Sequence, residues 1–375
     1  MKNRKVILLT IVVIFSAIVF LCMRGNSEKE KVSQFRIGAD ITLTGGISYW
    51  GQQIKKGLDL AAIEYNEKNT NAIIEIISQD NRGQVSDAIS IFRRFADVDG
   101  VSAVVSVFSP MSSPLRKFAG ECKLPLISTV VSAEGFGLAN EWSFRDFPSQ
   151  SQQSSTLARY VWDELKVRTA ATLVVTDEYG TDGEKVFVES FLKLGGKIFQ
   201  QEYVDQNAPS VRDQASKIIT SSPDCLYIVV RDLTLGKAVR LFRELGYKGY
   251  IVGVNAFDSP PVWEAAGKAG EGCVFTSAFV DLANPAAAGF VDNYKKVYSG
   301  ELPDWIAAYG YTMGSYICDA VIKAQGDRNI TRKLLSEVDT ESIRGKLYMD
   351  SNRDVISPIG IFVRRDGKNV LLGVK

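Results

Sequence analysis

The chain of 375 residues contains no histidine. This absence excludes Ser-His and Cys-His triads, imidazole general bases and histidine-ligated metal sites. Catalysis by carboxylate, lysine or cysteine groups remains open. An excess of charge of one sign is lacking too, because 44 Lys and Arg residues face 43 Asp and Glu residues, for a formal net charge of +1. A global basic field for nucleic acid is therefore excluded, and local groups must meet any charged ligand.

Nucleotide-binding and hydrolase signatures are missing as well. The chain has no GxxxxGK[ST] loop, no GxGxxG at a strand-to-helix turn and no GxSxG elbow. Asp40, Asp80 and Asp177 stand near expected strand ends, where a metal site is conceivable. Carboxylates in such places more often cap helices or face solvent. We therefore predict no catalytic residue, no metal site and no cofactor.

Cysteine is scarce, and its spacing is uninformative. There are five cysteines and no CxxC pair. If Cys22 is removed with the N-terminal segment, Cys122, Cys225, Cys273 and Cys318 remain. An oxidising compartment would permit disulfides, but these spacings specify none. We expect the four to serve mainly as small apolar core residues.

The longest apolar run lies near the N-terminus, at 6–23, after three basic residues. This pattern is typical of an export signal. The run is also close to the lower limit of about 18 residues for a membrane span. Cys22 follows Val-Phe-Leu, which resembles a bacterial lipobox only loosely. Residues 1–33 are thus assigned as an export signal or membrane anchor, and cleavage, lipidation at Cys22 and retention all stay open. The expected location is periplasmic or otherwise extracytoplasmic.

The remaining chain has the composition of a globular protein, 46% hydrophobic and 23% charged. Its length suffices for two domains, each with a core. From Phe35 onward, strand-like and helix-like segments alternate, which is the pattern of a parallel sheet covered by helices. The same rhythm begins again after Pro148. The predicted fold class is therefore α/β, with two Rossmann-like lobes.

The stretch 35–67 opens the first series. Apolar residues alternate over 35–41, as in a half-buried strand, and recur at helical spacing from Ile54 to Tyr65. Between these two patterns lie a Thr-Gly-Gly turn and Trp50. Ligands of open α/β sheets bind at this edge, where strands give way to helices. Taken alone, the stretch fits an ordinary strand-to-helix connection with a core tryptophan equally well.

Small hydroxyl side chains follow two further strands of the first series, and they include Ser109, Ser112 and Ser132. Carboxyl ends of parallel strands share one edge of the sheet, so these hydroxyls should lie near one another. Helix N-termini at that edge favour an anion such as a carboxylate. Plain helix capping explains each hydroxyl separately. Tyr179 and Trp305, like Trp50, are candidate apolar walls, although each alone is more often a core residue.

Four segments and their order carry a resemblance to a known family: IGADITLTGGISYWGQQIKKGLDLAAIEYNE, VVSVFSPMSSP, PLISTVVSAE and TDEYGTDGEKVF. From about Phe35 to the C-terminus the chain resembles the periplasmic substrate-binding proteins of branched-chain amino-acid type ABC transporters. The resemblance implies a two-lobed type I fold, or Venus-flytrap, with three chain crossings as its hinge and the ligand between the lobes. On this basis lobe 1 comprises 34–148 and 279–340, and lobe 2 comprises 149–278 and 341–375.

The resemblance also implies ligand contacts by position. Trp50 matches an aromatic residue that covers the ligand, and Ser109 matches the serine that binds the ligand carboxylate. Val130 and Ser132 match positions that hold the amino-acid backbone, while Tyr179 matches an aromatic residue from the second lobe. With three residues added, the predicted ligand-binding site is Trp50, Ser109, Ser112, Val130, Ser132, Tyr179, Arg231 and Asn255.

Two of these positions depart from the family pattern. Asn255 stands where amino-acid binders have an acidic residue for the ligand ammonium, and Arg231 stands where they often have an aromatic residue. A buried ammonium without a carboxylate partner is costly, so a plain α-amino acid is put in doubt. Asp258 or Asp232 could supply the partner if the alignment slips by a few residues. Arg231, if it faces the cleft rather than solvent, suits a second ligand carboxylate.

These observations predict an extracytoplasmic solute-binding protein that delivers a small organic acid, amide or atypical amino acid to the membrane subunits of an ABC permease. The ligand would close the lobes by a population shift. Contact with the membrane would be made only through the N-terminus, and nucleic acid is not an expected partner. One alternative is a ligand-sensing module anchored by an uncleaved N-terminal helix. A second alternative is a hydrolase that uses Asp or Lys chemistry.

Overall fold

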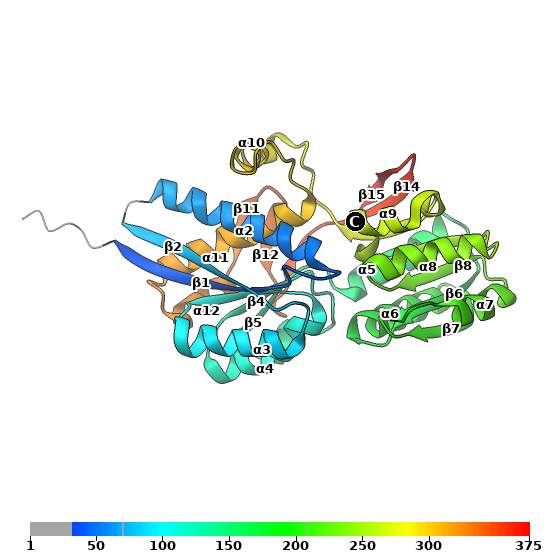
Figure 1. Ribbon diagram of the computed structural model, residues 1–375, viewed down its shortest axis with the longest axis horizontal. Coiled ribbons are helices and arrows are strands. Elements are labelled where there is room, and N and C mark those ends of the chain that lie inside the picture. The colour runs from blue at the N-terminus through cyan, green and yellow to red at the C-terminus, as the bar shows by residue number, and fades with distance from the viewer. Residues whose placement is uncertain (1–31, 70, 207) are drawn as a thin grey trace, which may run out of the picture.

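The computed structural model describes residues 32–69, 71–206 and 208–375. Within these residues no helix is long and apolar enough to cross a membrane. Apart from its last two positions, the segment 1–33 expected to be a signal or anchor lies outside the described residues, and so does Cys22. The described chain forms two lobes arranged along the long axis of the molecule (Figure 1).

The first lobe is built on a five-stranded parallel sheet with the order β2-β1-β3-β4-β5. Helices cover both of its faces, with α2 and α11 on one side and α3 and α4 on the other (Figure 1). All five residues of β3 are therefore buried, as expected for a central strand of a covered parallel sheet. The elements of this lobe are β1 (Ser33–Ile41), α2 (Ser48–Lys68), β2 (Ala72–Asp80), α3 (Val85–Arg94), β3 (Ala103–Val107), α4 (Ser109–Cys122), β4 (Leu126–Thr129), β5 (Ser143–Asp146), α10 (Ala288–Val297), α11 (Trp305–Lys323) and α12 (Arg328–Ser336).

Glycines let α2 and α11 pack unusually closely. A Cβ atom on Gly57 of α2 would lie 2.0 Å from the carbonyl oxygen of Ala307, and one on Gly310 of α11 would lie 2.3 Å from that of Ile54. Real Cβ contacts of this length do not occur, so these positions accept no larger residue unless the helices separate. The packing fixes the N-terminal end of α2, which carries Trp50.

The second lobe contains a seven-stranded sheet with the order β15-β14-β10-β9-β8-β6-β7. It is parallel from β10 to β7, whereas β14 and β15 form an antiparallel hairpin that pairs with β10. The elements are α5 (Gln150–Asp163), β6 (Thr169–Val175), α6 (Glu178–Lys193), β7 (Lys197–Val204), α7 (Arg212–Ser221), β8 (Cys225–Val229), α8 (Asp232–Glu244), β9 (Tyr250–Gly253), α9 (Pro260–Ala266), β10 (Val274–Ala278), β14 (Ile359–Arg365) and β15 (Lys368–Val374).

Each lobe has its own hydrophobic core, and the chain passes between the two cores three times. The crossings follow β5, β10 and the short strand β13. This organisation confirms the predicted α/β fold class with two lobes and a three-crossing hinge. Short single turns complete the chain at Phe95–Asp99, Gly137–Ala139, Asn255–Phe257, Gly267–Gly270 and Pro285–Ala287.

The segment 341–356, which the resemblance assigned to the second lobe, packs on the first one. Leu347 and Val355 belong to the first hydrophobic core, whereas Ile361 and Val363 belong to the second. The chain therefore changes lobes between Val355 and Ile361. A small antiparallel sheet that precedes this change consists of β11 (Asp339–Ser342), β12 (Gly345–Met349) and β13 (Val355–Ile356).

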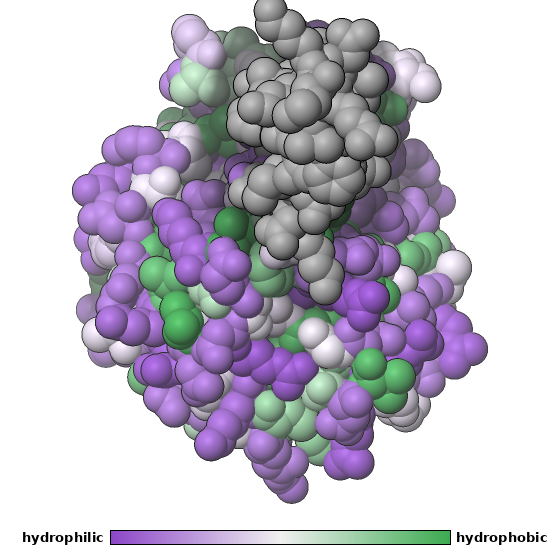
Figure 2. Space-filling view, turned by 90° about the vertical axis from the view of Figure 1, so that its left-hand side faces the viewer, coloured by the Kyte–Doolittle hydropathy of each residue, from purple (hydrophilic) through white to green (hydrophobic). Residues whose placement is uncertain are grey.

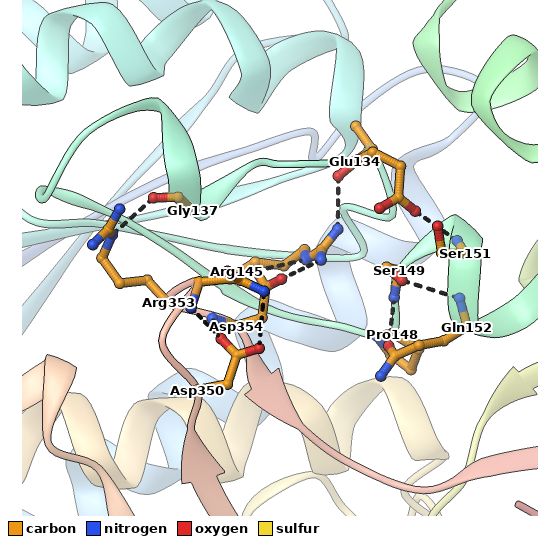
Figure 3. Close-up of polar contacts among 12 residues, drawn as sticks. Glu134, Gly137, Arg145, Pro148, Ser149, Ser151, Gln152, Asp350, Arg353 and Asp354 are labelled. Carbon is orange, nitrogen blue, oxygen red and sulfur yellow. Dashed lines mark hydrogen bonds and ion pairs between the residues drawn. The ribbon is translucent and has the colours of Figure 1, made fainter.

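An ion pair holds the last crossing to the first lobe. Arg145 of β5 donates from Nε to Oδ1 of Asp354 at 2.9 Å, and its Nη2 also pairs with the Asp354 carboxylate (Figure 3). Its Nη1 donates to the carbonyl oxygen of Ala133 at 2.6 Å. Asp350 accepts a hydrogen bond from the Asp354 N–H, which fixes this turn as well. Because Arg145 is buried, the pair is a rigid attachment for the strand that leaves the lobe.

The face of the molecule at the first-lobe end is mainly hydrophilic where described residues form it, with apolar side chains in small separate groups (Figure 2). Isolated apolar side chains of this kind are normal on a protein surface. The features that suggest a ligand lie instead between the lobes.

Candidate ligand-binding cleft

A cleft of about 810 Å³ opens between the two lobes. Its first-lobe wall comes from the ends of β1 and β2 and the start of α4, and its second-lobe wall comes mainly from the loop after β7 and from α8. Beside it lies a small chamber of about 20 Å³. Phe108 and Arg231 line both spaces, so the chamber is the inner end of the cleft. The residues that line the chamber are Trp50, Phe108, Ser109, Val130, Tyr179, Arg231, Asn255 and Ala256.

Six of the eight predicted site residues therefore surround one chamber, although they come from six different stretches of the chain. Ser112 and Ser132 do not line it. The Oγ of Ser112 lies 2.8 Å from the Oγ of Ser106, in a buried pair inside the first lobe. Ser132 lies at the first crossing, where its carbonyl oxygen accepts a hydrogen bond from the N–H of Gln150 at 2.8 Å.

Aromatic rings form the first-lobe wall of the chamber. Trp50, in the first turn of α2, is 3% exposed. It makes edge contacts with Phe108, at 6.4 Å between ring centroids, and with Trp305, at 5.5 Å. Trp305 was an expected wall residue, but it supports Trp50 from behind rather than lining the chamber. Sequence reasoning missed Phe108, for which the only signal was its place just before Ser109.

The start of α4 offers hydrogen-bond donors to the chamber. Ser109 is the first residue of this helix, and its Oγ is buried without a hydrogen-bond partner among the described residues. The first backbone N–H groups of a helix have no partner inside that helix, and the positive end of the helix dipole lies at the same place. Val130 lies beside this helix start, just after the neighbouring strand β4, at a φ of 54°, a conformation that an L-residue adopts at some cost. These groups together can receive a carboxylate.

The second-lobe wall consists of Tyr179, Arg231 and Asn255. The Tyr179 hydroxyl donates to Oδ1 of Asn255 at 3.4 Å. The N–H of Asn255 in turn donates to the Oε1 of Gln153 at 3.3 Å. Nε2 of Gln150 donates to the carbonyl oxygen of Tyr179 at 2.8 Å. Two glutamines of α5 therefore hold the wall in place from the hinge side.

Arg231 faces the cleft and is not a surface arginine, since its side chain is only 12% exposed. It forms a two-point ion pair with Asp177, Nη1 to Oδ2 at 2.8 Å and Nη2 to Oδ1 at 3.1 Å. Its guanidinium also lies 4.3 Å from the centre of the Tyr179 ring. Asp177 caps α6, as expected of a carboxylate after a strand, and accepts a hydrogen bond from Gly180. Its second role as the partner of Arg231 had no signal in the sequence.

Asp177 is the only acidic residue among the described residues that line the cleft or the chamber. Asp258, which could have replaced the missing acid at position 255, lies elsewhere. It accepts a hydrogen bond from Nδ2 of Asn369 at 2.8 Å and lines a separate cavity. The side chain of Asp232 lies outside the described part of the chain. The chamber itself therefore offers an ammonium group no free carboxylate from the residues described.

Comparison with known proteins gives a family match over nearly the whole chain. A family model described as "Periplasmic binding protein" matches residues 34–366. The chain is 24% identical to "Leu/Ile/Val-binding protein homolog 3" of Brucella melitensis over 354 residues, which cover 89% of this chain and 92% of that protein.

Two solved structures show the same fold. The branched-chain amino acid transporter substrate-binding protein of Streptococcus pneumoniae, in complex with isoleucine, has a TM-score of 0.84 at 22% identity and covers 92% of this chain and 99% of its own. A solute-binding protein of an ABC transporter from Rhodopseudomonas palustris, in complex with 3,4-dihydroxybenzoic acid, has a TM-score of 0.80 at 21% identity and covers 91% of this chain and 97% of its own.

Proposed function

Because the chain belongs to the periplasmic binding protein family, of the branched-chain amino-acid type, we propose that it is the solute-binding protein of an ABC importer. It captures a small carboxylate-bearing ligand between its lobes and delivers it to the permease. The family implies an extracytoplasmic location, and its members bind substrates rather than transform them. The observation that carries the proposal is the chamber to which both lobes contribute hydroxyl, amide and aromatic groups.

The carboxylate end of the ligand is assigned to the first lobe. The buried Oγ of Ser109 has no partner among the described residues, and a buried hydroxyl left in this state costs free energy. A ligand carboxylate would remove this cost by accepting hydrogen bonds from Ser109 and from the N-terminus of α4. Trp50 and Phe108 would cover the apolar part of the ligand.

The second lobe argues for a ligand without an ammonium group. Asn255 brings no charge to the chamber, and both oxygens of Asp177 are engaged by Arg231. An α-ammonium entering the chamber would lose its hydration without gaining a free carboxylate. We therefore assign the ligand to small organic acids or amides in preference to α-amino acids.

Binding requires the lobes to move. A chamber of about 20 Å³ has room for about one water molecule. Contacts across the cleft hold the present arrangement, as Oγ of Ser113 donates to Oε2 of Glu178 at 3.0 Å and the N–H of Glu134 donates to Oδ2 of Asp182 at 3.2 Å. A ligand would enter while the lobes are apart and would favour closure by contacting both of them. Membrane attachment through residues 1–33 stays a prediction.

The test uses pairs of compounds that differ only in the ammonium group. Calorimetry of the purified protein with 4-methylpentanoate and leucine, and with 3-phenylpropanoate and phenylalanine, should show tighter binding of the acid in each pair. Tighter binding of the amino acid would overturn the assignment to organic acids. Mass spectrometry of compounds that copurify with the protein would identify the natural ligand independently. Slow conversion of such a compound would favour the hydrolase instead.

The site assignment is tested by two substitutions and one control. Trp50→Ala and Ser109→Ala should each weaken binding of the acid by about tenfold or more, because they remove the apolar cover and a carboxylate donor. Ser90→Ala changes an exposed serine of α3 whose hydroxyl bonds only its own helix, so it should leave affinity unchanged. Unaltered affinity in both chamber variants would refute the site.

A further inference from the structure

A second cavity, of about 450 Å³, lies between the lobes, and none of its described lining residues also lines the cleft or the chamber. We call it the back cavity. Trp305 lines it and touches Trp50, which lines the chamber, so this pair of rings separates the two spaces. The first lobe contributes Tyr49, Asp304 and Trp305, and the second lobe contributes Asp258, Ser259, Pro260, Trp263, Glu264, Arg364 and Asn369.

The back cavity holds more acidic than basic groups. Among the described residues, Asp258, Asp304 and Glu264 line it together with one cation, Arg364. That cation is already engaged, because Nη1 of Arg364 donates to Oδ1 of Asn369 at 2.9 Å and its guanidinium lies over the Trp263 ring. Burial raises the pKa of Asp258 to about 7 and also raises the pKa of Asp304. Arg364, which also interacts electrostatically with Asp258, is therefore the one cation among the described lining residues that faces three carboxyl groups.

Aromatic and unsatisfied polar groups complete the walls. Tyr49, Trp263 and Trp305 supply rings, and the Tyr49 hydroxyl donates to Oδ2 of Asp304 at 2.6 Å. Ser259 is fully buried, and its Oγ has no hydrogen-bond partner among the described residues. A buried hydroxyl of this kind is explained if an occupant of the cavity donates a hydrogen bond to it.

We propose that the back cavity binds a small monovalent organic cation of the alkylammonium class. Its charge would meet the carboxylates of Asp258 and Asp304, its N–H groups would find Ser259 as an acceptor, and its alkyl part would lie against the tryptophan rings. A divalent metal ion fits less well, since no cluster of three acidic or cysteine side chains able to hold one occurs in the described residues. An occupant would bridge the lobes, because Asp304 belongs to the first and Asp258 to the second.

The test measures binding of n-butylammonium to the purified protein by calorimetry, at constant ionic strength. Saturable binding is expected, whereas n-butanol, which has the same alkyl chain without the charge, should bind much more weakly. Affinity should rise from about pH 6 to about pH 8, because Asp258 must lose its proton in a cavity that also holds Asp304, Glu264, Tyr49 and Arg364. Equal binding of butanol, or no saturable binding of the ammonium, overturns the proposal.

Substitutions locate the bound cation. Asp258→Asn should lower the affinity for butylammonium by about tenfold or more, because it removes a facing charge and keeps an acceptor for Asn369. Asp292→Asn, on the exposed side of α10, should leave the affinity unchanged. Unchanged affinity in the folded Asp258→Asn variant would overturn the assignment. If that variant does not fold, the comparison of butylammonium with butanol on the unsubstituted protein decides whether the proposal stands.

Discussion

Arg231 and Asp177 join the loop after β8 to the start of α6 by two hydrogen bonds, of 2.8 and 3.1 Å, where the binding cleft meets the chamber. The guanidinium also stacks over Tyr179, which fixes its plane. Each group thereby neutralises the other, so the cleft presents neither a free cation nor a free carboxylate at this point. The pair should control which charged groups a ligand can bring to the chamber.

Substitution of Arg231 should change ligand selectivity. In Arg231→Gln the Asp177 carboxylate loses its partner and becomes available to a ligand ammonium. We expect the affinity ratio of leucine to 4-methylpentanoate to rise by about tenfold, which corresponds to about 1.4 kcal/mol. Calorimetry with both compounds measures the ratio. Arg82→Gln is the matched control, because Arg82 also lines the cleft but is exposed and paired with Asp87. A ratio that shifts equally in both variants would contradict this role for Arg231.

The sequence alone predicted most of the residues that line the chamber, but it did not predict the ion pair of Arg231 with Asp177. Parallel strands end at one edge of a sheet, so the order of strands and helices along the chain was enough to place Ser109 at this edge. Val130, Arg231 and Asn255 were predicted only from the resemblance to the family. The hydroxyl of Ser112 points to Ser106 instead, and periodicity does not resolve such a difference of helical phase. The contact of Asp177 with Arg231 joins residues far apart in the chain, and nothing in either local sequence indicates it.

Helices and strands could be predicted from the sequence where the periodic pattern of apolar residues is long. Helix α11, for example, extends over Trp305–Lys323, and its 19 residues are long enough to show helical periodicity in the sequence. Strands β5 and β10 are only four and five residues long and are buried throughout, so no alternation of apolar and polar residues marks them in the sequence. The change of lobe after β13 depends on which core Leu347 and Val355 join, and that is decided by packing rather than by local sequence.

Close packing of α2 against α11 leads to a prediction about stability. A methyl group added in Gly310→Ala would meet the carbonyl oxygen of Ile54, so the helices must separate. We expect the free energy of unfolding to fall by about 1 to 3 kcal/mol, measured by chemical denaturation. Gly289→Ala in α10 is the control, since an added Cβ there meets nothing within 4 Å, and it should be neutral or slightly stabilising. Equal effects of the two changes would show that the close contact is not the cause.

The buried ion pair of Arg344 and Asp146 leads to a larger expected loss. Both side chains have no solvent exposure, Nη2 of Arg344 lies 2.7 Å from Oδ1 of Asp146, and Tyr316 also donates to this carboxylate. Asp146→Ala leaves the guanidinium charge buried and unpaired, which should cost about 3 to 5 kcal/mol of unfolding free energy. The pair of the exposed Glu141 with the partly buried Arg332 provides the control, because Glu141→Gln should change stability by less than about 1 kcal/mol. Similar losses would mean that burial does not determine the effect.

Asp40 should make stability depend on pH. Its Oδ1 accepts a hydrogen bond from Nδ2 of Asn81 at 2.8 Å, while its Oδ2 is buried without a partner among the described residues. Burial raises the pKa of this carboxyl to about 7, and the nearby charge of Asp87 raises it slightly further. Between about pH 4 and pH 7 the folded chain therefore keeps a proton that the unfolded chain has released. The contribution of this group to the free energy of unfolding is fully present below about pH 4, and it is lost as the pH rises from there through about 7.

The substitution Asp40→Asn removes this titration and keeps an acceptor for Asn81. The unfolding free energy of the variant relative to the wild type should therefore rise between about pH 4 and pH 8, by about 4 kcal/mol. Urea denaturation at several pH values measures this difference, and subtracting the wild type cancels the other titrating groups that the two proteins share. Asp292→Asn, at an exposed position, should give a difference that does not vary with pH. A flat difference for Asp40→Asn as well would mean that the buried carboxyl is ionised in the folded protein, and that a positive group or water reaches its Oδ2.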